Sequence, residues 1–203
     1  GSTAGGTPLM KEAGHSGDVI FNSVSVGKGA NSVSGNTVLG SAALDANVTG
    51  GNNTAIGSAA LTDNTSGANN TAVGSSSLDV NTTGASNTRV GRSSLGSNIS
   101  GDFNTAVGHG ALLSNTTVDN NTAVGYLSLN LNTTGSENTA IGSKALDANT
   151  TASNNTAVGY NALSSNTTGH SNSSLGTFAL QSSTTGDNNC AFGRSALQNN
   201  TTA

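Results

Sequence analysis

The residues that most often perform chemistry are few in this chain, and their spacing is not typical of a catalytic or metal-binding site. His15, His109 and His170 lie far apart in the sequence. The ten acidic residues are scattered and lack the Asp-x-Asp-x-Asp spacing of a calcium loop. None of the many serines lies in a Gly-x-Ser-x-Gly elbow followed by an Asp and a His in the order that a hydrolase needs. The sequence therefore predicts no metal site, no cofactor and no enzymatic activity.

A repeat of 17 residues organises most of the chain. The motif Asn-Thr-Ala-Val-Gly, or a close variant, begins at Asn36 and recurs ten times without slippage. We number each repeat from its Asn as position 0. Position 3 is then always apolar, position 4 always Gly, position 8 always Leu, and position 11 Asn in nine copies. A fixed short period without insertions indicates a one-dimensional stack of similar units. The sequence predicts an all-β parallel β-solenoid in which each repeat forms one coil.

The chain divides into two parts on this basis. Residues 1–21, which include the tag-like Gly1 and Ser2, lack the repeat and are expected to form an irregular lead-in or cap. Residues 22–203 form the repeat domain, with an imperfect shorter coil at 22–35 and a truncated tenth repeat at the end. We interpret the chain as a piece of a longer protein.

The columns of the repeat predict where each side chain points. Thr-x-Val alternates like a short strand, and position 2 is expected to face outward because Arg89 occupies it in one copy. Positions 1 and 3 would then face inward. Ala-Leu at positions 7 and 8 would begin a second strand, and Asn-Thr-Thr-Gly at positions 11–14 a turn whose Asn and Gly are left-handed. Asn ladders at positions 0 and 11 would join the coils. The predicted core residues are Val73, Leu78, Val107, Leu112, Val124, Leu129, Val158 and Leu163, and the predicted turn glycines are Gly74, Gly108, Gly125 and Gly159.

Composition limits the partners that the chain could bind. Its net charge is −4 with no basic stripe, so binding to nucleic acid is not indicated. No apolar run approaches the roughly 20 residues that cross a bilayer, so this segment is not expected to insert into a membrane. Each coil offers only about two large apolar side chains, because aromatic residues are 3% of the chain. Sharing this thin core among several chains would bury more apolar area, which favours an oligomer.

The variable column at position 5 provides the candidates for ligand contact. It carries serines in four copies and larger side chains in others. Variation beside fixed neighbours indicates a face without packing constraints, and exposed tyrosines suit contact with glycan or protein. Neutral surface variation, or packing between protomers at Leu127 and Phe178, is the alternative interpretation. The candidate residues are Arg92, His109, Tyr126, Tyr160 and Arg194.

The motif Asn-Thr-Ala-Val-Gly-x-x-Ala-Leu, preceded by Asn-Thr-Thr-Gly, resembles the head repeats of trimeric autotransporter adhesins (YadA-like heads) and related repeats in phage tail fibres and bacterial surface fibres. The resemblance covers about residues 22–203, and the short segment Asn22–Gly27 is most similar to the adhesin version. It implies a left-handed parallel β-roll, three chains packed about a threefold axis, and an extracellular place on a bacterial surface or virion. The 17-residue period departs from the adhesin heads, which usually repeat every 14 or so residues, and favours the fibre branch.

These observations predict a structural and adhesive segment of a trimeric surface fibre. It would space or present a binding tip, with its own copies as partners and host glycan or protein as a further partner. Two alternatives stay open. An ice-binding solenoid is suggested by Thr-rich columns at positions 1, 12 and 13, although position 1 is expected to face inward. A self-polymerising filament subunit would stack through exposed coil edges.

Overall fold

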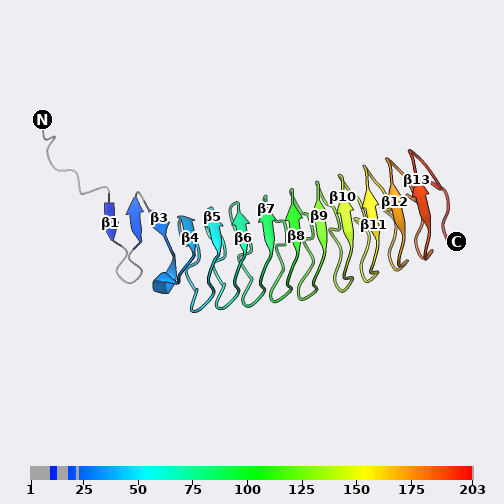
Figure 1. The fold of residues 1–203 in the computed structure, drawn as a ribbon. Coiled ribbons are helices and arrows are strands. Elements are labelled where there is room, and N and C mark those ends of the chain that lie inside the picture. Colours follow the sequence, from blue (N-terminus) through cyan, green and yellow to red (C-terminus); the bar gives the residue numbers. More distant parts are fainter. Residues whose placement is uncertain (1–9, 13–17, 22, 203) are drawn as a thin grey trace, which may run out of the picture.

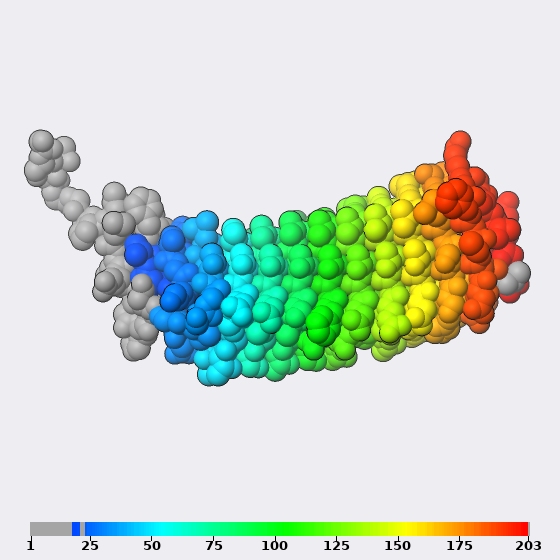
Figure 2. All heavy atoms as spheres, in the orientation of Figure 1, coloured from blue at the N-terminus to red at the C-terminus, as the bar shows by residue number. Residues whose placement is uncertain are grey.

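The computed structural model describes residues 10–12, 18–21 and 23–202. Within them the chain forms a single sheet whose strand order follows the sequence from β1 to β13. Figure 1 shows the strands side by side along a rod, with each coil looping away from the sheet and returning to the next strand. In Figure 2 the surface atoms of successive coils line up in rows along the rod. The predicted β-solenoid with 17-residue coils is confirmed.

The N-terminal strands are antiparallel. β1 (Met10–Glu12), β2 (Val19–Phe21) and β3 (Val24–Gly27) form a meander, and β3 pairs antiparallel with β4 (Thr37–Gly40) after the short 3₁₀ helix η1 (Ala30–Ser32). The described residues before Asn36 thus form an antiparallel end of the sheet. Residues 1–9, 13–17 and 22 lie outside the described chain, and His15 is among them.

Ten parallel strands follow from β4 onward, one in each coil, paired without any shift of register. Coil 1 begins at Asn36 and coil 10 at Asn189. The strands after β4 are β5 (Thr54–Ile56), β6 (Thr71–Val73), β7 (Thr88–Val90), β8 (Thr105–Val107), β9 (Thr122–Val124), β10 (Thr139–Ile141), β11 (Thr156–Val158), β12 (Ser173–Leu175) and β13 (Cys190–Phe192).

Each coil has one strand, and the predicted second strand at positions 7 and 8 is wrong. These positions belong to a turn, and the position-8 leucines have left-handed backbone, with φ of 52° at Leu112. Left-handed residues also occupy positions 6 and 16, as at Lys144 and Asn120, so the prediction that Asn and Gly at positions 11–14 supply them is also wrong. These sharp corners let a 17-residue coil close with three strand residues.

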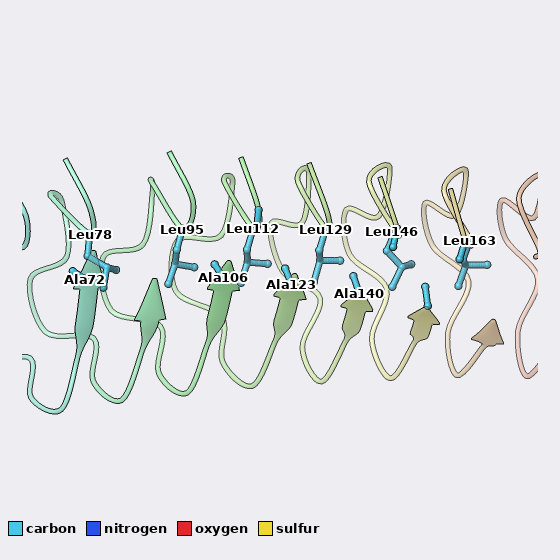
Figure 3. Close-up of a cluster of buried hydrophobic side chains, with 14 of the residues drawn as sticks. Ala72, Leu78, Leu95, Ala106, Leu112, Ala123, Leu129, Ala140, Leu146 and Leu163 are labelled. Carbon is cyan, nitrogen blue, oxygen red and sulfur yellow. The ribbon is translucent and has the colours of Figure 1, made fainter. Parts of the chain in front are cut away.

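The strand faces opposite to the prediction. Position 2 points into the coil and its alanines are buried, whereas positions 1 and 3 lie on the outer face of the sheet. In a strand, side chains two residues apart share a face. Because the orientation of position 2 was predicted wrongly, the predicted orientations of positions 1 and 3 are wrong as well. The predicted core residues Val73, Val107, Val124 and Val158 therefore lie on the outside, where they are half-buried. Leu78, Leu112, Leu129 and Leu163 are fully buried, and Figure 3 shows rows of Ala and Leu side chains in the interior.

Two buried Asn columns connect the coils, as predicted. At position 0, Oδ1 of Asn53 accepts a hydrogen bond from the backbone N–H of Asn70 at 2.9 Å. At position 11, the amide of Asn81 donates to Oδ1 of Asn64 at 2.8 Å. Both columns also donate to the carbonyl oxygen of position 14, for example Gly84. These bonds satisfy polar groups inside a rod whose apolar core is almost entirely Ala and Leu.

The position-4 glycines are required by both conformation and space. Their φ is +136° at Gly74, +122° at Gly108, +135° at Gly125 and +138° at Gly159. A Cβ on Gly125 would lie 2.5 Å from the carbonyl oxygen of Gly142 in the next coil. A side chain at Gly125 would therefore force the two neighbouring coils apart.

Candidate functional site

The position-5 residues that we predicted as ligand contacts form an exposed row along one flank of the rod. Arg92, His109 and Tyr126 lie in three successive coils, and the rings of His109 and Tyr126 stack with centroids 5.7 Å apart and planes at 21°. Tyr160 follows two coils later and contacts Phe178 edge-on at 5.4 Å. Tyr126 and Tyr160 are each about half exposed. The structure thus brings together a basic group and a short aromatic platform.

Arg194 stands apart from this group. It is exposed at position 5 of coil 10, and Thr177 separates it from Tyr160 along the row. It therefore shares the residue type and position of Arg92 without its surroundings.

The sequence analysis placed Arg89 on the outside and did not identify it as a site residue, but it is 1% exposed and lies inside coil 4. Its Nε donates to Oγ of Ser94 at 3.2 Å, and its NH1 lies 4.0 Å from Oδ1 of Asp79 in coil 3. NH1 itself makes no hydrogen bond. Every other residue at position 2 is Ala, Val or Ser, and this uniform small size was the available signal that the column is interior.

Burial lowers the pKa of Arg89 to about 10, and the Asp79 carboxylate acts in the opposite direction. The guanidinium is still protonated at neutral pH. A charge with one incomplete ion pair and one side-chain hydrogen bond is costly in an interior of Ala and Leu. Arg89 is therefore expected to destabilise the fold relative to the Ala found at this position in most other coils.

A hollow of about 380 Å³ opens on the same flank, between coils 3 and 4. Its lining is polar and includes Arg92 from the position-5 row. Ser94, which accepts the hydrogen bond from Arg89, directly follows one of the lining residues in the sequence. The lining residues are Ser75, Ser76, Arg92 and Ser93.

The outer face of the sheet is a second candidate surface. Position 1 contributes a row of Thr, which becomes Ser173 and Cys190 in the last two coils, and position 3 contributes a row of aliphatic residues that ends at Phe192. Cys190 is exposed. Several position-3 side chains are 38% to 45% exposed, including Leu39, Val90 and Leu175.

Within the described residues, no three His, Cys, Asp or Glu side chains lie close enough to hold a metal ion. The same part of the chain contains no helix of the length and apolar character needed to span a bilayer. Comparison with protein-family models, curated proteins and solved structures found no match to this chain.

Proposed function

We propose that this chain is a rod-forming, adhesive segment of a trimeric fibre on a bacterial surface or virion, in which copies pack through the outer face of the sheet. The supporting observation is an aliphatic row that continues without interruption across the sheet. Val19 pairs with Val26, and Val26 pairs with Leu39, so the N-terminal strands extend the position-3 row of the ten coils. Val26 is 46% exposed.

The chemistry of this face suits contact between copies. No charged residue occurs at position 1 or 3 in any of the ten coils, although charged residues occur on the flanks and turns. The strands are in register and about 4.8 Å apart, so the rows are straight and regular. A long uncharged row of Val, Ile and Leu beside a row of Thr is the kind of exposed surface that usually marks an interface.

Three copies and a fibre role come from the resemblance to adhesin heads and tail-fibre repeats. The rod geometry supports the fibre role, because a solenoid lengthens by one strand spacing for each added coil and can hold a binding tip at a set distance. The row from Arg92 to Tyr160 lies on a flank, away from the sheet face, so it stays accessible in an oligomer. Three copies of such a row would raise avidity without strong individual sites.

Light scattering after size exclusion tests this proposal. The expected molar mass is close to three times the 19.6 kDa of one chain. Lysine at Val107 and Val124 should give monomers, because charges would be buried in the interface. Ile99→Lys is the matched control, since Ile99 is 45% exposed at position 12, off the sheet face. A monomeric wild-type chain at high concentration would overturn the proposal.

Ice binding is a second candidate, favoured by one observation. The Thr row at position 1 faces outward, which removes the objection raised by the expected inward orientation. Regular Thr rows on a flat sheet are, by resemblance, how ice-binding solenoids match the ice surface. This function needs the same face to be free in solution. Thermal hysteresis in a monomeric sample would support it, and its absence would remove this candidate.

A further inference from the structure

Coils 3 and 4 are separated along one flank of the rod. Between the other neighbouring coils from coil 1 to coil 10, backbone N–H groups at positions 6, 8 and 10 each donate to a carbonyl oxygen of an adjacent coil, at 2.8–3.3 Å. Between coils 3 and 4 all three bonds are missing: those from Ser93, Leu78 and Val80. The strand side is intact, with 2.8 Å from the N–H of Thr71 to the oxygen of Asn87.

Arg89 accounts for this separation. It puts a long side chain into a space that holds Ala in most other coils. Its guanidinium reaches from coil 4, where it bonds Ser94, to coil 3, where it lies near Asp79. The side chain therefore spans the two coils where their backbone bonds are lost, and acts as a wedge between them.

The separation leaves hydrogen-bond donors without partners. The buried NH1 of Arg89 and the buried hydroxyl of Ser77 make no hydrogen bond. The backbone N–H groups of Leu78, Val80 and Ser93 make none with the described chain. The polar hollow that contains Arg92 lies at the same junction. Two unpartnered buried side-chain groups at one junction are uncommon in folded proteins, and together with the polar hollow they indicate a place that receives polar atoms.

The charges identify the kind of group. Two of the six Lys and Arg residues of the chain, Arg89 and Arg92, lie three residues apart in this coil, opposed by the single carboxylate of Asp79. Arginine and clustered hydroxyl and N–H donors favour oxyanions, because charge-assisted hydrogen bonds to carboxylate or sulfate are the strong ones. His109 and Tyr126 occupy the same position as Arg92 in the next two coils, and each coil is about one strand spacing from the one before it. Their stacked rings offer a platform for a sugar ring.

We propose that the wedge-opened junction of coils 3 and 4 binds the carboxylate or sulfate group of an acidic glycan, with Arg92 and the serine hydroxyls on the oxyanion and the His109–Tyr126 pair under an adjoining sugar. This rests on the adhesive role proposed above and gives it a site and a ligand class. It does not require the oligomer, because the hollow lies within one chain.

Isothermal titration calorimetry at low salt tests the site with three probes: trigalacturonate, neutral maltotriose and sodium sulfate. Trigalacturonate should bind and maltotriose should not. Arg92→Ser, which installs the residue that Ser75 and Ser143 provide at this position, should weaken binding by about tenfold or more. Arg194→Ser is the matched control and should leave binding unchanged. Asp79→Asn should tighten binding, because it removes the competing carboxylate.

Arg89→Ala tests the wedge itself. It restores the common residue of the column and should close the junction, so that trigalacturonate binding is lost while the melting temperature does not fall. No heat with any probe overturns the site. Equal affinity for sulfate and trigalacturonate, with no effect of Tyr126→Ser, overturns the glycan assignment. Light scattering on the same samples reports the oligomer independently, so either proposal can fail alone.

Discussion

Asn115 and Asn132 occupy the same position in successive coils, yet the amide of Asn132 bonds only the carbonyl oxygen of Gly135, at 2.7 Å, and Oδ1 of Asn115 accepts nothing. The residue between them at position 14 is Val118, where most coils have Gly. A Cβ at this position meets the carbonyl of the next coil, as the 2.5 Å from a Cβ on Gly101 to the oxygen of Val118 illustrates. The bulk of Val118 thus opens the Asn column.

The neighbouring backbone bond follows the size of the position-14 residue. With Gly101 in the coil, the N–H of Ile99 lies 2.8 Å from its acceptor in the next coil. With Ala152, the corresponding distance at Thr150 is 3.3 Å, and with Val118 no bond forms from Thr116. Side-chain bulk at this position therefore weakens the ladder step by step.

Val118→Gly should stabilise the protein by about 1 kcal/mol. It should restore the hydrogen bond from the side-chain amide of Asn132 and the hydrogen bond from the backbone N–H of Thr116. The free energy of these two bonds should exceed the cost of the entropy that Gly adds to the unfolded chain. Urea unfolding followed by circular dichroism measures the change. Ala152→Gly should give a smaller gain, and a loss of stability in Val118→Gly would show that Val118 packs favourably.

Arg89→Ala should also stabilise the protein, by about 1–3 kcal/mol at neutral pH, because it removes a buried charge and lets three backbone bonds form. Arg92→Ser, three residues away and exposed, should change stability by less than about 0.5 kcal/mol. Arg89→Met is a volume control: it removes the charge but keeps the wedge, so it should recover only part of the gain.

The pH dependence of that gain has a defined sign. Burial lowers the pKa of Arg89 to about 10 in the folded state, so between this value and the higher ordinary pKa the unfolded state binds more protons. The wild type therefore gains stability as the pH rises above 10. The amount by which its free energy of unfolding falls below that of Arg89→Ala should become smaller. Urea unfolding of both proteins at pH 8 and pH 11 measures this. A deficit that grows with pH would contradict the burial of a charged Arg89.

Periodicity alone predicted the solenoid, the buried Leu column and both Asn ladders, because each repeats in phase and has one satisfactory environment. The orientation of the strand could not be settled in this way, since positions 1, 2 and 3 are all uniform and only Arg89 distinguished them. Arg89 is the exception in its column, because it is buried although it is charged, and its burial is expected to lower the stability of the fold. The left-handed corners were also hidden, because Leu and Lys are not typical of that conformation. The N-terminal meander has no repeat and gave no periodic signal.

Asn81→Ala should cost about 2–4 kcal/mol. It removes donors to Oδ1 of Asn64 and to the oxygen of Gly84, and it leaves the amide of Asn98 without the acceptor that lies 2.9 Å away. Thr83→Ala, at an exposed position of the same turn, is the control and should be nearly neutral. Urea unfolding measures both. Equal, small effects would mean that the ladder contributes little beyond what water provides.

Val107 and Leu112 distinguish the interior of one chain from a face shared between chains. Leu112 is fully buried within its coil, so Leu112→Ala should cost about 2–5 kcal/mol whatever the oligomeric state. Val107 is half-buried on the sheet face. If that face is covered by other copies, Val107→Ala should cost about 1–2 kcal/mol and make the melting temperature more dependent on protein concentration. If the face is free, the cost should be under about 0.5 kcal/mol with no concentration dependence. Thermal unfolding over a hundredfold range of concentration decides between these outcomes, with Leu112→Ala as the reference for a loss confined to one chain.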